Sequence, residues 1–134
     1  MKKKGFTLVE LLMVVIIIGI LVTLAVPNYY RSIERAKAGK AKAAMDAIRK
    51  GELQYRAFND TYSDDLADLE AYDLPKDLWD NASDGDWTYT ITTFTASELV
   101  IDSAREAGPN SGATLTMDQD GQIINVDAVL EWGA

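Results

Sequence analysis

An apolar segment near the start of the chain limits what this sequence can fold into. Only four residues between Phe6 and Val26 are not apolar: Thr7, Glu10, Gly19 and Thr23. About 20 apolar residues in helical form cross the hydrocarbon core of a bilayer, so the segment predicts a membrane span. Lysines at positions 2–4 precede it. By the positive-inside rule they place the start of the chain in the cytoplasm, and the residues after Pro27 are expected to be exported.

Glu10 is the residue that does not suit a membrane span. A carboxylate at the centre of a bilayer costs about 2.5–3.5 kcal/mol even on lenient insertion scales, and acids in such positions usually pair with a cation. The apolar segment itself contains no cation. Cleavage between Gly5 and Phe6 would create one, because the new amine of Phe6 would lie one helical turn from Glu10.

The residues around this bond resemble the start of type IV pilins, including the pseudopilins of type II secretion. The matching residues are Gly5, Phe6, Thr7, Leu8, Glu10, Gly19 and Pro27. The resemblance implies that prepilin peptidase removes residues 1–5 as a leader and methylates the new amine of Phe6. It also implies that Glu10 pairs with the amine of a neighbouring subunit. In filaments of this family the segment between such a glycine and proline can lose helical structure, which the resemblance suggests for Gly19 to Pro27.

Two simpler interpretations of the apolar segment stay open. A secretory signal peptide also begins with basic residues and an apolar run, and Thr23-Leu24-Ala25 resembles its cleavage site. An ordinary membrane anchor with one stray acid is the other. The segment is longer than the 7–15 residues of a typical signal core, and Glu10 is out of character in either case.

The composition excludes several kinds of active site. The chain of 134 residues has no cysteine and no histidine. Zinc sites built on these residues and nucleophile–histidine pairs are therefore absent, and no spacing marks two carboxylates as an acid–base pair. We expect a protein that is not an enzyme and holds no cofactor. Many type IV pilins close a loop near the C-terminus with a disulfide, whereas this chain must close it by packing and hydrogen bonds.

The two halves of the chain carry opposite charge. Residues 1–58 contain 11 basic and 4 acidic side chains, and residues 59–134 contain 2 and 17. The acidic half argues against direct binding of nucleic acid, because phosphate contacts need a cationic surface. We expect the basic stretch to face the acidic surface of another subunit or anionic lipid headgroups.

The hydropathy pattern predicts an α+β fold in which a long N-terminal helix packs on a four-stranded antiparallel sheet. We divide the chain into a leader (1–5), a transmembrane and filament-core helix (6–27), an amphipathic helix (28–58) and a globular head (59–134). We expect Pro27 to kink the helix, with Gly19 as a second weak point. An apolar stripe at helical spacing should pack on the head: Ala41, Ala44, Ile48, Gly51, Tyr55 and Phe58.

The head is predicted from turn residues and from alternation. Ser63 is expected to cap a short helix over 64–69, and an acidic loop is expected over 70–86. Strands are predicted over 87–94, 98–104, 113–117 and 122–126, with a turn over 118–121. The last residues, 127–134, can pack Val129, Leu130 and Trp132 against the head.

Three aspartates raise the question of calcium. Asp80, Asp84 and Asp86 surround Gly85, but Ala82 and Ile91 occupy positions where an EF-hand has oxygen ligands. The local pattern of the calcium-binding loop in major pseudopilins is not found either. We therefore predict no metal site and interpret the segment as an acidic, solvated loop.

Three functions compete. The first is a subunit of a surface type IV pilus that serves adhesion, twitching motility or DNA uptake. The second is a pseudopilin that drives export through a type II secretion system, and the third is an anchored binding module that does not polymerise. By resemblance, the partners are other copies of the chain in a helical homopolymer, prepilin peptidase, an inner-membrane platform protein and an assembly ATPase. The chain would start in the inner membrane with its head in the periplasm, and end in an extracellular pilus or a periplasmic pseudopilus.

Overall fold

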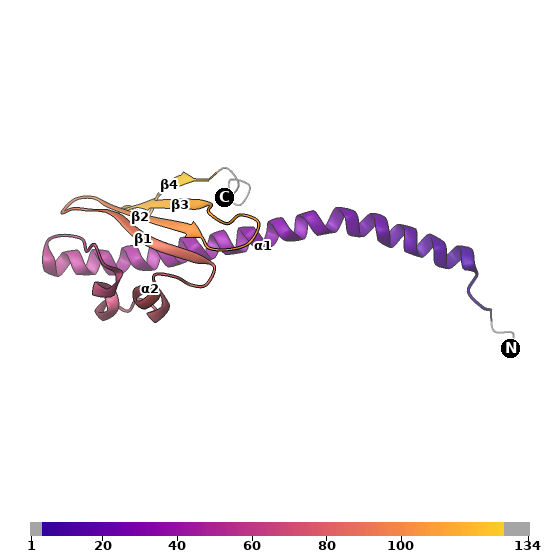
Figure 1. Cartoon of the computed structure of the whole chain (residues 1–134), viewed down its shortest axis with the longest axis horizontal. Coiled ribbons are helices and arrows are strands. Elements are labelled where there is room, and N and C mark those ends of the chain that lie inside the picture. Colours follow the sequence, from indigo (N-terminus) through magenta and orange to yellow (C-terminus); the bar gives the residue numbers. More distant parts are fainter. Residues whose placement is uncertain (1–3, 128–134) are drawn as a thin grey trace.

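One helix, α1 (Leu8–Asn59), runs almost the full length of the molecule, and its second half carries the head (Figure 1). The computed structural model describes residues 4–127. With 52 residues, α1 is about 78 Å long at 1.5 Å per residue. It ends at Asp60, which has a left-handed backbone and donates its N–H to the carbonyl of Arg56 at 2.8 Å. The expected α+β fold is confirmed.

The helix is continuous through Gly19 and Pro27, although its first half is curved (Figure 1). Pro27 has no N–H, so the carbonyl of Thr23 loses its usual helical partner. The tertiary structure around this point offers no substitute, because the residues on both sides are exposed. The loss of helical structure from Gly19 to Pro27 in the assembled state stays a prediction.

The predicted stripe on α1 packs on the head over most of its length. Ala41, Ile48 and Gly51 are buried, and Ala44 and Tyr55 are partly buried. The expectation for Phe58 is wrong, since its side chain is 80% exposed and contacts the ring of Tyr72 with centroids 6.3 Å apart. Phe58 lies in the last turn of α1, beyond the main contact with the head.

Two short helices follow α1, and both differ from the predictions. A 3-10 helix, η1 (Leu66–Tyr72), begins after Asp65, whose carboxylate accepts a hydrogen bond from the N–H of Ala67. Ser63 is not the cap, because its hydroxyl is bonded to Asp65 and Asp68. The predicted loop over 70–86 contains a helix, α2 (Lys76–Asn81). Pro75 precedes this helix, and burial of Leu78 stabilises it.

The sheet has the predicted four antiparallel strands in the order β1-β2-β3-β4. Their bounds are β1 Trp87–Phe94, β2 Leu99–Arg105, β3 Thr114–Asp118 and β4 Ile123–Val126, so three of the four start one residue later than expected. The expected turn over 118–121 is present, with Gly121 at φ 81° and its N–H bonded to the carbonyl of Asp118. One face of the sheet covers α1, and the opposite face carries threonines and faces solvent.

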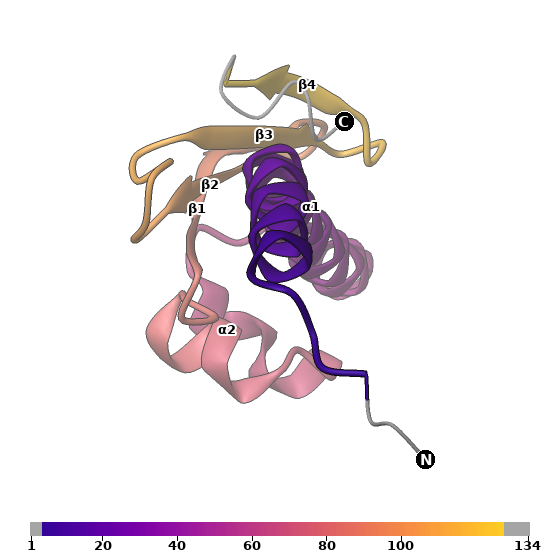
Figure 2. The ribbon, with the colours of Figure 1, turned by 90° about the vertical axis from the view of Figure 1, so that its right-hand side faces the viewer.

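The core lies between this sheet, α1 and the two short helices (Figure 2). Its largest fully buried side chains are those of Met45, Ile48, Leu69, Trp87, Tyr89, Leu99, Ile101 and Leu115. The expected packing of Val129, Leu130 and Trp132 lies outside the described residues.

Candidate functional site

The first half of α1 exposes a continuous apolar surface. Phe6 is 88% exposed, and the large apolar side chains from Leu8 to Val26 all lie in solvent-accessible positions. This is the one helix among residues 4–127 that is long and apolar enough to cross a membrane. A contiguous apolar surface of this size must be covered by lipid or by other protein. The chain is therefore anchored in a membrane or buried in an assembly through this segment.

Glu10 and Thr7 form a capping box at the start of α1. The carboxylate of Glu10 accepts hydrogen bonds from the backbone N–H of Thr7 at 2.8 Å and from its hydroxyl at 2.9 Å. The hydroxyl of Thr7 accepts a hydrogen bond from the N–H of Glu10 at 3.2 Å. Such boxes satisfy N–H groups that a helix start leaves without partners. Thr7 is the only hydrogen-bond partner of the Glu10 carboxylate within residues 4–127.

The bond between Gly5 and Phe6 lies in an exposed, irregular segment immediately before the helix. Lys4, Gly5 and Phe6 line a small hollow together with Glu10. Cleavage of this bond would place the new amine next to the capping box. The predicted processing site and the predicted assembly residues are thus brought together, while their roles stay predictions.

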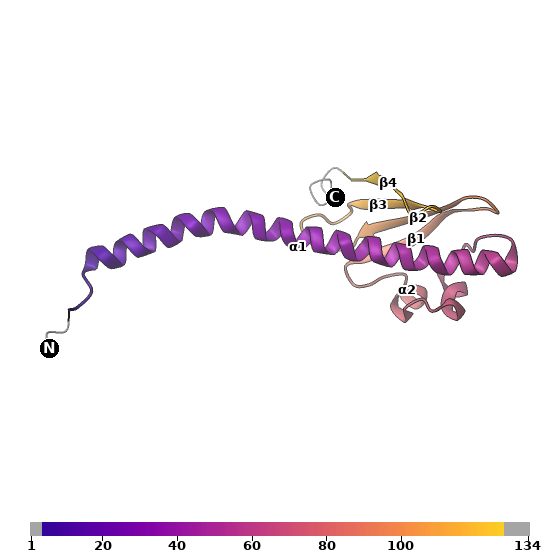
Figure 3. The same ribbon diagram turned by 180° about the vertical axis from the view of Figure 1, so that it is seen from behind.

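The second half of α1 presents small side chains on the side away from the sheet. Seen from behind, α1 runs uncovered in front of the head (Figure 3). Small exposed residues on this side of the helix include Ser32, Ala36, Gly39 and Ala43. A Cβ atom added to Gly39 would meet nothing within 4 Å. Small residues allow another helix backbone to approach closely, so this side of α1 is suited to helix packing.

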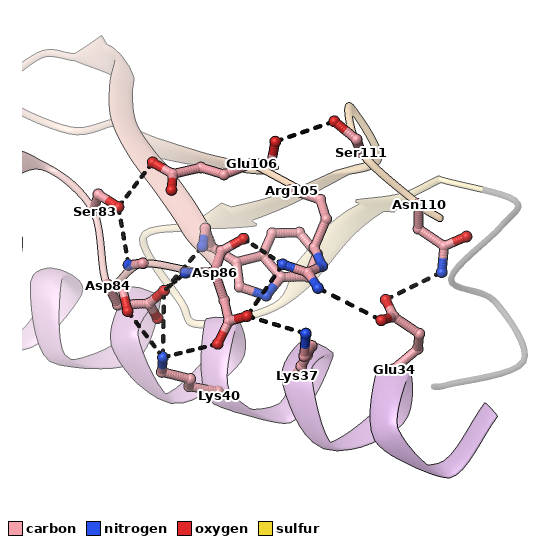
Figure 4. A network of polar contacts seen from close by, with 12 residues as sticks. Glu34, Lys37, Lys40, Ser83, Asp84, Asp86, Arg105, Glu106, Asn110 and Ser111 are labelled. Atoms are coloured by element: carbon pink, nitrogen blue, oxygen red, sulfur yellow. Dashed lines mark hydrogen bonds and ion pairs between the residues drawn. The ribbon is translucent and has the colours of Figure 1, made fainter. Parts of the chain in front are cut away.

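A buried charge network joins α1 to the sheet where the head begins (Figure 4). Arg105 at the end of β2 is 3% exposed, and its guanidinium lies 5.8 Å from the ring centre of Trp87. It pairs with Glu34 of α1 at 3.5 Å and donates a hydrogen bond to the carbonyl of Asp86 at 2.7 Å. Asn110 donates to the other oxygen of Glu34 at 3.1 Å. The network fixes α1 to the loops at the membrane-proximal end of the head.

Sequence reasoning missed this network. Glu34 lies on the buried side of α1, but it precedes Ala41, where the predicted apolar stripe begins. Arg105 ends a strand whose other inward residues are small or apolar. One available signal was the alternation in β2, which puts Arg105 on the same face as Leu99, Ile101 and Ser103.

The three aspartates considered for calcium separate into two places. Asp80 lies on α2, 3.9 Å from Lys76. Asp84 and Asp86 instead surround Lys40, whose ammonium lies 3.5 Å and 3.1 Å from their carboxylates. A hydrogen bond from Lys40 is the main cause that lowers the pKa of Asp86. Burial alone would raise the pKa of Asp84, but hydrogen bonds from Tyr89 and from backbone amides outweigh it and lower the pKa. No group of three metal-binding side chains occurs between residues 4 and 127.

Glu52 is a second buried acid in the core side of α1. It has no exposed surface, and one carboxylate oxygen accepts the N–H of Ser63 at 2.9 Å. Its other oxygen has no hydrogen-bond partner among the described residues. Burial raises the pKa of Glu52 to about 7, helped by the charges of Asp68 and Asp64, while the bond from Ser63 opposes the shift. The hydrogen bond from Ser63 to Glu52 holds the loop after α1 against the helix. The free-energy cost of burying the Glu52 charge depends on pH.

This raised pKa predicts that the head becomes more stable as the pH falls. An unfolded glutamate titrates near 4.5, so the folded chain binds a proton at a higher pH than the unfolded chain does. The cost of burying the charge is fully present above pH 7, decreases as the pH falls toward 4.5, and is absent below it. We expect Glu52→Gln to remove this part of the pH dependence, which corresponds to about 10 °C in Tm between pH 8 and pH 5. Thermal unfolding of the detergent-solubilised chain at pH 5 and pH 8 measures this change in Tm.

The matched control is Glu98→Gln at an exposed turn. Equal slopes of Tm against pH for the wild type and Glu52→Gln would contradict the prediction.

Comparisons with known proteins agree with the N-terminal geometry. Residues 1–26 match the family model described as the prokaryotic N-terminal methylation motif. The chain is 31% identical to the type II secretion system core protein G of Vibrio cholerae, over 85% of this chain and 90% of that protein. It is 40% identical to the type IV major pilin protein PilA of Myxococcus xanthus, over 47% of this chain and 29% of the pilin. It is 45% identical to the type IV narrow pilus major component PilA5 of Thermus thermophilus, over 37% of this chain and 42% of that protein.

The chain thus spans less than half the length of these two pilins, and nearly all of the secretion protein. The similarity to the secretion protein extends through the head, whereas the similarity to these two pilins is limited to part of the chain. Proteins of this kind are structural subunits that polymerise and are processed by prepilin peptidase. Three observations agree: an exposed apolar helix with Gly5, Phe6 and Glu10 at or just before its start, the methylation motif, and a relative matched over most of its length. The chain therefore belongs to the family of type IV pilins and type II secretion pseudopilins.

Proposed function

We propose that this chain is the structural subunit of a type IV pilus that serves surface adhesion, twitching motility or DNA uptake. Prepilin peptidase cleaves the bond between Gly5 and Phe6 and methylates the new amine. The processed chain waits in the inner membrane with its head in the periplasm, and an assembly ATPase and a platform protein then add it to an extracellular filament. The acidic head is not expected to bind nucleic acid directly.

The observation that carries this proposal is the exposed apolar half of α1 with a single carboxylate at its start. Lipid tails cover apolar side chains as well as a neighbouring helix does, so apolar burial gives no preference for the assembled state. Glu10 supplies that preference, because in lipid its charge has Thr7 as its partner and no cation. In a bundle of processed helices, the amine of a neighbouring Phe6 would neutralise it. Pairing would favour addition in one axial register.

The small exposed residues in the second half of α1 support the same proposal. They continue the uncovered side of the helix past the membrane, where Gly39 and Ala43 leave room for a neighbouring backbone. A membrane anchor that does not polymerise needs no such side. The apolar core of a filament would then extend into the region of the heads.

A pseudopilin that drives protein export through a type II secretion system is the second candidate. The match to core protein G over 90% of that protein favours it. The identities to the two pilus subunits, 40% and 45%, are higher but cover only part of each chain. Both candidates use the same processing and the same apolar helix, so they differ in where the filament accumulates.

Intact mass measurement on sheared filaments tests the proposal. Filaments are sheared from the native cells, and the mass of this chain is measured in the sheared and membrane fractions. We expect abundant sheared chain that begins at methylated Phe6. The same processed mass confined to the membrane fraction would assign the chain to a pseudopilus instead. A chain that still begins at Met1, or begins near Val26, would contradict processing at Gly5.

A further inference from the structure

Two surfaces on opposite flanks of α1, one basic and one acidic, cannot meet within one chain. We propose that they meet between chains: a basic ridge, formed by Arg31 and Lys42, binds an acidic knob, formed by η1, α2 and their flanking residues, on a second copy of the chain. This inference rests on the proposed polymerisation and specifies which surfaces of the heads touch.

The acidic knob is rich in charges that have no ion pair. Six of its acids are exposed and take part in no ion pair with any residue from 4 to 127: Asp64, Asp65, Asp68, Glu70, Asp73 and Asp77. Lys76 is the one basic side chain from residue 60 to residue 81, and it lies near Asp80. So many like charges repel one another, and a cationic partner would relieve the repulsion.

The basic ridge is what remains after the other cations of α1 have found partners. Lys37 and Lys40 pair with Asp86, while Arg49 and Lys50 pair with Asp46. In contrast, Arg31 and Lys42 form no ion pair within the part of the chain that the structure describes. Lys42 follows Arg31 by eleven residues, which is close to three helical turns, so the two side chains lie on one side of α1. The ridge is therefore a cationic surface available to a partner.

The ridge and the knob lie on opposite flanks of α1. Arg49, which is 18 residues and five full turns after Arg31, contacts the carbonyl of Gln119 in the turn between β3 and β4. This places the ridge on the flank next to β4. Leu69 of η1 packs against Gly51, on the other flank, and viewed along α1 the two flanks are separated by the helix (Figure 2).

Surfaces of opposite charge on opposite flanks produce a head-to-tail contact. Such a contact is heterologous, because each subunit uses one surface to bind the next and keeps the other surface free, and it builds an open helix when the rotation does not close. The knob lies beside residues 51–55 of α1, and the ridge is centred some 16 residues earlier. Two copies in contact are thus displaced by about 24 Å along the helix axis. A side-by-side dimer with no displacement would not bring the surfaces together.

Charge reversal with rescue tests the contact. We compare filament yield for a ridge variant (Arg31→Glu with Lys42→Glu), a knob variant (Asp64→Lys with Glu70→Lys) and the chain that carries all four changes. Each reversal alone is expected to lower the yield at least tenfold, and the combination to restore it to within about threefold of the wild type. Matched controls away from both surfaces are Lys50→Glu and Glu98→Lys, which should leave the yield unchanged. Failure of the combination to recover would overturn the contact and would assign the ridge to lipid headgroups.

Disulfide trapping separates this inference from the proposed function. The chain has no cysteine, so the variant with Lys42→Cys and Glu70→Cys contains only the introduced pair. Mild oxidation in the cells should give a ladder of multimers, whereas either single substitution should give none beyond a dimer. Filaments without a ladder would overturn the contact and leave the pilus role intact. A ladder in cells that shear no filaments would support the contact and contradict the pilus role.

Discussion

Replacement of Glu10 by valine is expected to abolish filaments and to leave the chain inserted in the membrane. Valine removes the one charge in the apolar segment, so insertion becomes easier rather than harder. It also removes the group that would pair with the amine of a neighbouring Phe6, and with it the preference for assembly over lipid. We expect sheared filament to fall by a factor of 100 or more, with the amount of chain in the membrane fraction unchanged.

Two further variants separate pairing from helix capping. In the chain as described, Glu10 also caps α1 through Thr7. Thr7→Val removes the hydroxyl partner of Glu10 but keeps the charge, so it should reduce filament yield far less than Glu10→Val does. Glu10→Gln keeps a side chain that can accept a hydrogen bond but removes the charge, and it should behave like Glu10→Val. Normal filament yield from Glu10→Gln would contradict the pairing role.

Replacement of Arg105 by leucine is expected to destabilise the head more than any surface substitution. Glu34 is only 8% exposed, and without Arg105 it would keep Asn110 as a neutral partner for a buried charge. The loss of one member of a buried ion pair typically costs about 3–5 kcal/mol. For a domain of this size the loss corresponds to a fall in Tm of about 12 °C or more. Thermal unfolding of the solubilised chain, followed by near-UV circular dichroism, measures it.

The double variant Glu34→Leu with Arg105→Leu identifies the cause. Removal of both charges leaves no uncompensated carboxylate, and a buried ion pair replaced by apolar residues often loses little stability. We therefore expect the double variant to regain at least half of the lost Tm. Lys76→Ala, at an exposed pair on α2, is the control and should change Tm by about 2 °C at most. A double variant as unstable as Arg105→Leu would mean that packing around the guanidinium, rather than its charge, holds the loops.

The long helix and the order of the strands could be predicted because they depend on local periodicity. The apolar segment, the spacing of Ala41 and Ile48 and the alternation after Trp87 each repeat over enough residues to identify an element. The resemblance around Gly5 and Glu10 added the processing site and the assembly residues. That part of the candidate site lies in consecutive residues, which is why the sequence alone could locate it.

The parts that could not be predicted depend on residues far apart in the chain. Glu34 and Arg105 are 71 positions apart, and neither stands out until the fold brings them together. The helix α2 is short and has charged residues on its outer side, so its composition is that of a loop, and only the burial of Leu78 identifies it as part of the core. The prediction for Phe58 was wrong because it was based on local periodicity alone. The helical pattern continues to Phe58, but it does not show where the contact between α1 and the head ends.

The loop between β2 and β3 is closed without a covalent bond. Hydrogen bonds of the backbone join Arg105 to Ala113 and Gly112, at 2.9 Å and 2.8 Å, while Asn110 holds the loop to Glu34 of α1. Backbone hydrogen bonds and partly buried contacts of this kind are little affected by salt, and no thiol–disulfide chemistry can break them. The head therefore needs no oxidising catalyst to reach its final shape. Filaments built from it would keep their shape under strongly reducing conditions, such as sulfide-rich water or an anaerobic sediment.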